Sequence, residues 1–200
     1  LKGESFVKLK GKHIGFGLTG SHCTYDVVVP QFQRLIDEGA NVTPFVTYTV
    51  KNTVTKFGDG RDWVKKVEEI TGNEAVDSMV KAEPFGPQTP LDCMVLAPLT
   101  GNSISKFANA QTDSPPLMGA KATLRNQNPV VLGISTNDGL GLNGINIMRL
   151  MSTKNIYFIP YSQDNPIQKP NSLVAHMDLL VETIEAALEG KQYQPVLMMR

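Results

Sequence analysis

Small and hydroxyl-bearing residues follow the first apolar segment of the chain. The letters GLTGS occupy positions 17–21, where Thr19, Gly20 and Ser21 combine a flexible backbone with two hydroxyls. Glycine lets backbone N–H groups approach an anion closely, and the helix that follows adds the positive end of its dipole. These residues predict a phosphate cradle. A tight strand-to-helix turn is an equally good interpretation, because the dinucleotide pattern GxGxxG is matched here by letter only.

A second cluster of this kind, APLTGNS, occupies positions 97–103. Pro98 stops the strand ladder, and Thr100, Asn102 and Ser103 then open a helix. Such a helix start is a second candidate site for an anion. The alternative is that Asn102 or Ser103 only caps the helix.

Among the three histidines, His22 is the one placed for function, because it adjoins the first cluster. We expect His13 at the surface or edge of the sheet and His176 on a solvated face of the last helix. Cys23 is either a reactive thiol at a helix start or a buried one, and Cys93 is expected to be buried.

Carboxylates give no strong catalytic signal. Asp113 and Asp138 are isolated near loops that follow predicted strands, and no pair has a spacing that indicates two-carboxylate catalysis. The cysteines have no histidines at metal-ligand spacing, so no metal is expected. The catalytic residue is therefore unknown, with His22, Asn137 and Asp138 as the candidates.

Hydrophobic periodicity predicts alternating strands and helices. The predicted strands are 13–18, 41–48, 93–99, 129–135 and 156–160, and the predicted helices are one beginning in 21–24 and ending near 39, then 61–72, 102–110, 115–127, 144–153 and 172–190.

The first of these helices carries its own boundary signals. Ser21 or Thr24 could cap its start, and Gly39 is suited to its end. Pro30 removes a backbone donor, so we expect either a kink or a true start closer to this residue.

The alternation predicts an α/β fold, a parallel sheet with helices on both faces. It forms one domain over 13–190, preceded by a lead-in of 1–12 and followed by a tail of 191–200. Polar clusters follow four strands, at 19–22, 47–53, 97–103 and 135–143. Ligands of such sheets bind at the carboxyl ends of the strands, so these clusters predict one shared pocket.

The charge balance bears on partners. Nineteen Lys and Arg oppose nineteen Asp and Glu, and 41% of the residues are hydrophobic. No surplus positive field exists to attract nucleic acid or an anionic membrane. The sequence has no signal peptide pattern and no run near the ~18 apolar residues of a membrane span. We therefore expect a cytoplasmic protein with neither kind of partner.

Three separated motifs resemble those of the flavoprotein family, which includes the homo-oligomeric flavin-containing cysteine decarboxylases. They are positions 17–21, 97–113 with KFANAQTD at its end, and STNDGLGLN at 135–143. The resemblance implies a three-layer Rossmann-like, flavodoxin-like fold, a homo-oligomer (trimer or dodecamer) and FMN as a cofactor. The segments IGFGLTGSHCTY, AKATLRN, TKNIYF and others along nearly the whole chain resemble, within that family, the group that serves dipicolinate synthesis in spore-forming bacteria.

That closer resemblance implies a partner, the A subunit of dipicolinate synthase, which would carry the NAD(P) site. The two chains would together oxidise a dihydrodipicolinate-type dicarboxylate to dipicolinate in the mother-cell cytoplasm during sporulation. Two alternatives stay open: a non-catalytic scaffold or anion-binding subunit that has lost the flavin, and, less favoured, an FMN-dependent decarboxylase.

The family's cofactor-binding positions are carried over by motif. Residues 19–21 would hold the flavin phosphate, Thr47 and Thr49 would line the ribityl region, and Asn102 with Ser103 would close the site. The full predicted set is Thr19, Gly20, Ser21, Thr47, Thr49, Pro98, Thr100, Asn102, Ser103 and Asn137. The decarboxylases carry their catalytic histidine in the region that here spans 49–92, which contains no histidine, and this argues against decarboxylation.

Overall fold

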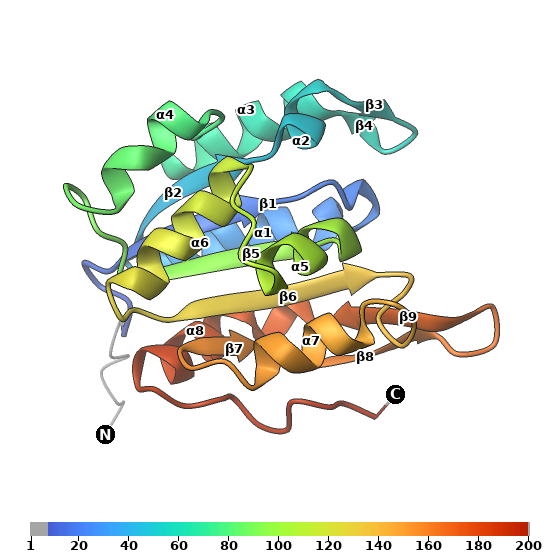
Figure 1. The fold of residues 1–200 in the computed structure, drawn as a ribbon. Helices are drawn as coiled ribbons and strands as arrows, with labels where there is room; N and C mark the ends of the chain where they lie inside the picture. Colours follow the sequence, from blue (N-terminus) through green and yellow to red (C-terminus); the bar gives the residue numbers. More distant parts are fainter. Residues whose placement is uncertain (1–7, 200) are drawn as a thin grey trace, which may run out of the picture.

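A seven-stranded sheet with helices on both faces forms the centre of the computed structural model, which describes residues 8–199 (Figure 1). The strands are β1 (His13–Leu18), β2 (Asn41–Val46), β5 (Cys93–Leu99), β6 (Val130–Thr136), β7 (Ile156–Phe158), β8 (Tyr161–Asn165) and β9 (Lys169–Ala175), with a separate small hairpin of β3 (Val54–Thr55) and β4 (Gly58–Asp59). The helices are α1 (Tyr25–Asp37), α2 (Tyr48–Asn52), α3 (Gly60–Thr71), α4 (Met79–Ala82), α5 (Gly101–Ala108), α6 (Pro115–Arg125), α7 (Gly144–Met151) and α8 (Leu180–Leu188), with 3₁₀ turns η1 (His22–Thr24), η2 (Glu83–Phe85) and η3 (Met177–Leu179).

The sheet order is β2-β1-β5-β6-β9-β8, with β7 also paired to β6. Strands β2, β1, β5, β6 and β7 pair in parallel, as the sequence predicts for strands joined by helices. Every residue of β5 is buried, which fits its place between β1 and β6. This single α/β domain confirms the predicted fold class.

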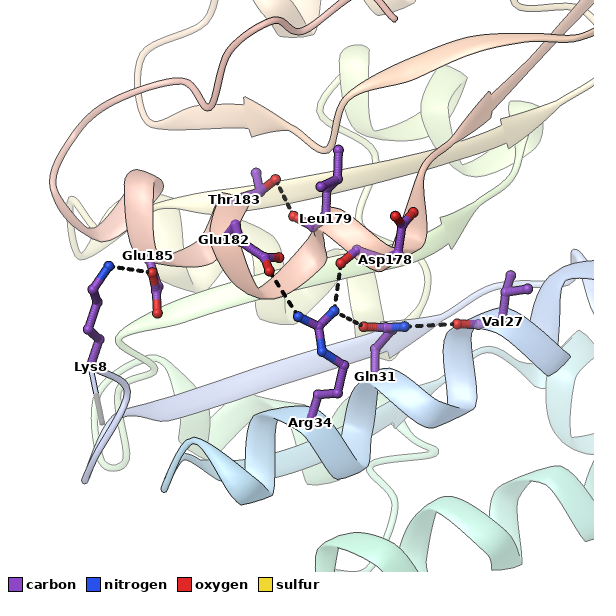
Figure 2. A network of polar contacts seen from close by, with 9 residues as sticks. All are labelled: Lys8, Val27, Gln31, Arg34, Asp178, Leu179, Glu182, Thr183 and Glu185. Carbon is purple, nitrogen blue, oxygen red and sulfur yellow. Dashed lines mark hydrogen bonds and ion pairs between the residues drawn. The ribbon is translucent and has the colours of Figure 1, made fainter. Parts of the chain in front are cut away.

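Helices α5, α6 and α7 cover one face of the sheet, and α1 and α8 cover the other (Figure 1). Figure 2 shows how α1 and α8 are linked: Arg34 donates to Glu182 at 3.0 Å and to the Asp178 carbonyl at 2.6 Å. A further hydrogen bond from Arg34, to Gln31 at 2.9 Å, holds the guanidinium in place. The two helices therefore form one connected layer.

The predicted helix over 172–190 is wrong in its first third. Residues 169–175 form β9, which pairs antiparallel with β8 and with the end of β6. The helix α8 begins only at Leu180, after the turn η3. Strand pairing with two neighbours outweighs the helical spacing of the apolar residues here, and the sheet is mixed rather than wholly parallel.

The second predicted strand ends two residues earlier than expected. It stops at Val46, and Thr47 caps α2 by accepting a hydrogen bond from the Val50 N–H at 3.3 Å. The polar segment that follows contains α2 and the β3–β4 hairpin, neither of which the sequence analysis predicted.

Helix α1 begins at Tyr25 and continues through Pro30, so its start is not delayed. Neither Ser21 nor Thr24 caps it with a side chain, because the Thr24 hydroxyl donates back to the Ser21 carbonyl at 2.8 Å. Gly39 follows the helix with φ +79°, as predicted for its end.

Both ends of the described chain contact the domain. Leu9 is fully buried in the core. Beyond α8, the backbone of Val196 and Met198 exchanges hydrogen bonds with Tyr161 of β8, each 3.0 Å long. The tail therefore runs along the edge of the sheet.

Candidate functional site

Two adjacent cavities open at the carboxyl ends of β1, β2, β5 and β6, where the polar clusters of the sequence meet. The first, of about 620 Å³, is lined by Gly20, Ser21, Cys23, Thr24, Thr100, Gly101, Asn102, Ser135, Thr136, Asn137, Asp138, Asp164, Lys169, Ser172, Leu173 and Val174. The second, of about 510 Å³, is lined by Thr19, Gly20, Thr47, Tyr48, Thr49, Asp77, Ser78, Met79, Thr100, Asn102, Ser103, Lys106, Asp113, Ser114 and Pro115. Gly20, Thr100 and Asn102 border both cavities and form what we call the shared boundary.

Thr19 connects the ends of β1 and β5. Its hydroxyl donates to the Pro98 carbonyl at 2.7 Å and accepts from the Thr100 N–H at 3.0 Å. A hydroxyl has one proton, so that of Thr19 is not available to a phosphate. Thr19 therefore positions the shared boundary, and Pro98, which lines neither cavity, serves it through its carbonyl.

Helix α5 starts at the shared boundary. Its cap is Thr100, whose hydroxyl accepts from the Ser103 N–H at 3.4 Å, so the alternative of Asn102 or Ser103 as the cap is wrong. The exposed Asn102 side chain faces both cavities and has no hydrogen-bond partner among residues 8–199. The first-turn N–H groups of a helix lack intrahelical acceptors, so this corner offers amide donors.

Thr47 and Thr49 lie in the second cavity, at the start of α2. An added Cβ at Gly20 would lie 3.1 Å from Cγ2 of Thr49, so the loop and the helix approach closely there. On the side of the first cavity, Ser21 and Ser135 share a hydroxyl hydrogen bond of 2.9 Å. The loop is thus supported from both sides.

Asp138, a catalytic candidate, is held by its neighbours. Its carboxylate accepts from the Thr136 hydroxyl at 2.5 Å and from the Asn143 amide at 2.8 Å. It lies against Gly101, at the start of α5. A helix start attracts negative charge, so this arrangement stabilises α5.

Asn137, the third candidate, is exposed in the first cavity, where its side-chain oxygen accepts from the Ser172 hydroxyl at 3.4 Å.

His22 does not line either cavity. Its side chain is only 7% exposed, packs against the Tyr25 ring at 5.0 Å between centroids, and places Nδ1 3.2 Å from the Gly20 carbonyl. Cys23, in contrast, is exposed and lines the first cavity, whereas Cys93 is buried as predicted. The sequence thus identified the region correctly but gave no sign of which way His22 turns.

The other two histidines have structural contacts. His13 is half-buried, bonds the Thr43 hydroxyl at 2.9 Å, and has its pKa lowered by burial, against the opposing effect of Asp92. His176 is not on the last helix as expected: it precedes η3 and shares a hydrogen bond of 3.0 Å with Ser162.

Several charged residues of the cavities were missed by sequence reasoning. Lys169 and Asp164 form an ion pair of 2.9 Å in the β8–β9 hairpin, which the sequence analysis did not predict. In the second cavity Lys106 pairs with Asp113 at 2.6 Å, so Asp113 is not isolated. The spacing KxxxxxxD was visible in the sequence, but only the fold brings the two ends together.

Within residues 8–199, no group of three or more His, Cys, Asp and Glu side chains is arranged to hold a metal ion. No helix in that part of the chain has the length and apolar character needed to cross a membrane.

Comparisons with known proteins extend over most of the chain. The family model "Flavoprotein" matches residues 3–185. The B subunit of dipicolinate synthase from Bacillus subtilis (strain 168) is 70% identical over 190 residues, which is 95% of each chain. The crystal structure of the corresponding B subunit from Bacillus halodurans C is 72% identical, with a TM-score of 0.89 over 96% of this chain and 98% of that one.

A more distant structure shares the fold alone. DmrB of Burkholderia xenovorans in complex with FMN is 15% identical, with a TM-score of 0.65 over 89% of this chain and 96% of that one. Together with the matched family model and the identity to the two B subunits, this fold agrees with the sequence motifs. The chain belongs to the flavoprotein family, in the group of the dipicolinate synthase B subunits.

Proposed function

We propose that this chain is the flavin-binding subunit of a two-subunit dipicolinate synthase, and that the shared boundary and the second cavity hold FMN. The observation that carries the proposal is the meeting of two polar cavities at Gly20, Thr100 and Asn102, beside the start of α5. Membership of the flavoprotein family supports the choice of FMN as the ligand.

The hydroxyl groups around the second cavity fit a phosphate and a ribityl chain. Thr47 accepts from Val50 and Ser103 accepts from Thr100, at 3.3 Å in each case. The protons of these two hydroxyls have no acceptor within the described part of the chain, so they are available as donors. We assign Gly20, Asn102 and Ser103 to the phosphate and Thr47 with Thr49 to the ribityl chain.

A bound flavin would supply a two-electron acceptor for the aromatisation of a dihydropyridine dicarboxylate. The chain's own contribution is to hold the phosphate and to line the first cavity, where Asn137, Ser172 and Lys169 offer donors suited to carboxylates. Oxidation to the pyridine removes a hydride and a proton, and aromaticity supplies the driving force. No strong base from this chain is then required.

We propose further that the chain acts in the cytoplasm with the A subunit of the synthase, which would hold NAD(P), and that it forms a homo-oligomer. Support comes from the names of the two relatives, each one half of a lettered pair, and from apolar side chains on and before α7. Leu142 is 89% exposed, Ile145 68% and Met148 53%.

The test is a titration of the purified chain with FMN, followed by the change in the visible flavin bands. Asn102→Asp replaces an amide donor with a carboxylate at the shared boundary, and we expect FMN to bind about tenfold to a hundredfold more weakly. Asn41→Asp is the matched control, because Asn41 is exposed at the start of β2, at the opposite end of the sheet. It should bind FMN as the parent does.

Reconstitution with the A subunit and a dihydrodipicolinate-type substrate separates the alternatives. Dipicolinate formation that depends on FMN, and that falls in Asn102→Asp, supports the proposal. A chain that binds no flavin but still supports dipicolinate formation is the scaffold or anion-binding subunit instead. Release of carbon dioxide by the chain alone would indicate the decarboxylase.

A further inference from the structure

Three consecutive carbonyl groups of the loop at positions 19–21 each accept a hydrogen bond from a side chain that follows it. The Thr19 carbonyl accepts from the Tyr25 hydroxyl at 2.8 Å and the Ser21 carbonyl from the Thr24 hydroxyl at 2.8 Å. Between them, the Gly20 carbonyl lies 3.2 Å from Nδ1 of His22. Because a carbonyl oxygen only accepts, Nδ1 is the donor in this pair.

These contacts fix which way the peptide groups of the loop point. The peptide bonds at 19–22 are trans, and in a planar trans peptide the N–H points opposite to the C=O. The carbonyl oxygens are turned toward η1 and α1, so the N–H groups of Gly20 and His22 point the other way. Gly20 itself lines both cavities.

The ring of His22 is placed by this one polar contact. It is 7% exposed and packs against Tyr25, which is itself fully buried. Its Nε2 atom is buried and has no hydrogen-bond partner among residues 8–199. No other polar group of the described chain competes with the Gly20 carbonyl for the ring.

We propose that His22 is a positioning residue, which holds the Gly20 carbonyl away from the cavities so that the loop can accept the phosphate group of its ligand. This inference rests on the proposed binding of FMN at the shared boundary. An apolar side chain at position 22 would leave the Gly20 carbonyl without its donor. The peptide could then rotate, and its negative end would oppose an anion in the cavity.

The test compares the affinities of FMN and riboflavin, which differ only in the phosphate, for the full chain and two variants. His22→Leu removes the donor, whereas His22→Asn keeps an N–H near the position of Nδ1. We expect His22→Leu to lower the preference for FMN over riboflavin about tenfold, the size of one hydrogen bond's contribution, with riboflavin affinity unchanged. His22→Asn should restore most of the preference.

His176→Leu is the control, because it removes a histidine hydrogen bond to Ser162 outside the loop. Its preference for FMN should equal that of the parent. A His22→Leu variant that loses affinity for both ligands equally, or for neither, overturns the proposal, since a general effect on folding would not distinguish them.

A parent chain that binds neither flavin refutes the proposed function, and the role of His22 is then decided by NMR. The resonances of the Gly20–Ser21 peptide should shift in His22→Leu and return in His22→Asn if His22 holds that carbonyl. Unmoved resonances in His22→Leu overturn the inference, whatever the flavin titration shows.

Discussion

Substituting Gly101 by alanine should destabilise the protein through contacts that surround the start of α5. An added Cβ would lie 2.6 Å from Oγ1 of Thr136, 2.7 Å from Oδ1 of Asp138 and 2.9 Å from Nδ2 of Asn143. Real Cβ atoms essentially never approach other atoms that closely. These three side chains are bonded to one another, so none can move without breaking a hydrogen bond.

The magnitude follows from opposing effects. Overpacking costs about 1–3 kcal/mol, and each hydrogen bond lost adds about 1 kcal/mol. Alanine in a helix returns at most about 1 kcal/mol relative to glycine. We therefore expect Gly101→Ala to lower the free energy of unfolding by about 2 kcal/mol, which for a chain of this size is a fall in Tm of about 4–8 °C.

Urea denaturation followed by circular dichroism measures this change. Gly141→Ala is the matched control, because its Cβ would meet only the Asp138 carbonyl, at 3.4 Å. Its free energy of unfolding should stay within about 0.5 kcal/mol of the parent's, the range of an unconstrained surface position. A Gly101→Ala variant as stable as the parent, or a control equally destabilised, would refute the account of this network.

Three further predictions concern other parts of the chain. Tyr25→Phe removes the hydroxyl bonded to the Thr19 carbonyl and should cost about 1 kcal/mol in urea denaturation, whereas Tyr48→Phe, at an 80% exposed side chain, should cost nothing; equal losses would contradict this. Burial lowers the pKa of His13 below its usual 6.5, so the unfolded chain takes up the proton first and the free energy of unfolding falls as the pH drops below about 6.5. Non-titrating His13→Gln should flatten this dependence between about pH 7 and 5, and an unchanged slope would show that other groups cause it. A disulfide reagent should modify Cys23 in the native protein and Cys93 only on unfolding, because burial raises the pKa of the Cys93 thiol; Cys23→Ser should remove the native reaction, and its persistence would mean that Cys93 is accessible.

Much of the fold was predictable because its central strands are continuous apolar runs bounded by turn residues. Strands β1, β5 and β6 lie within a residue of their predicted positions for that reason. The β8–β9 hairpin was not predicted, since Leu173 and Val174 fit the spacing of the following helix as well as they fit a strand. Pairing with β6 and β8 decides the matter, and it is not visible in the local sequence.

The position of the site was predictable in the same way, but the orientation of its side chains was not. Parallel strands bring their carboxyl ends to one edge, so the sequence placed Gly20, Asn102 and Asp138 together correctly. Whether a hydroxyl faces the cavity or the backbone depends on its partners. Thr19 turned out to bond Pro98, and His22 turned out to bond Gly20, through contacts that no spacing rule contains.

The most direct test of the central claim is a crystal structure of the full chain grown with FMN. We expect the phosphate within hydrogen-bond distance of Gly20 and Asn102 at the start of α5, with the ribityl chain toward Thr47. Flavin bound elsewhere, or a phosphate distant from these residues, would contradict the assignment of the shared boundary as the cofactor site.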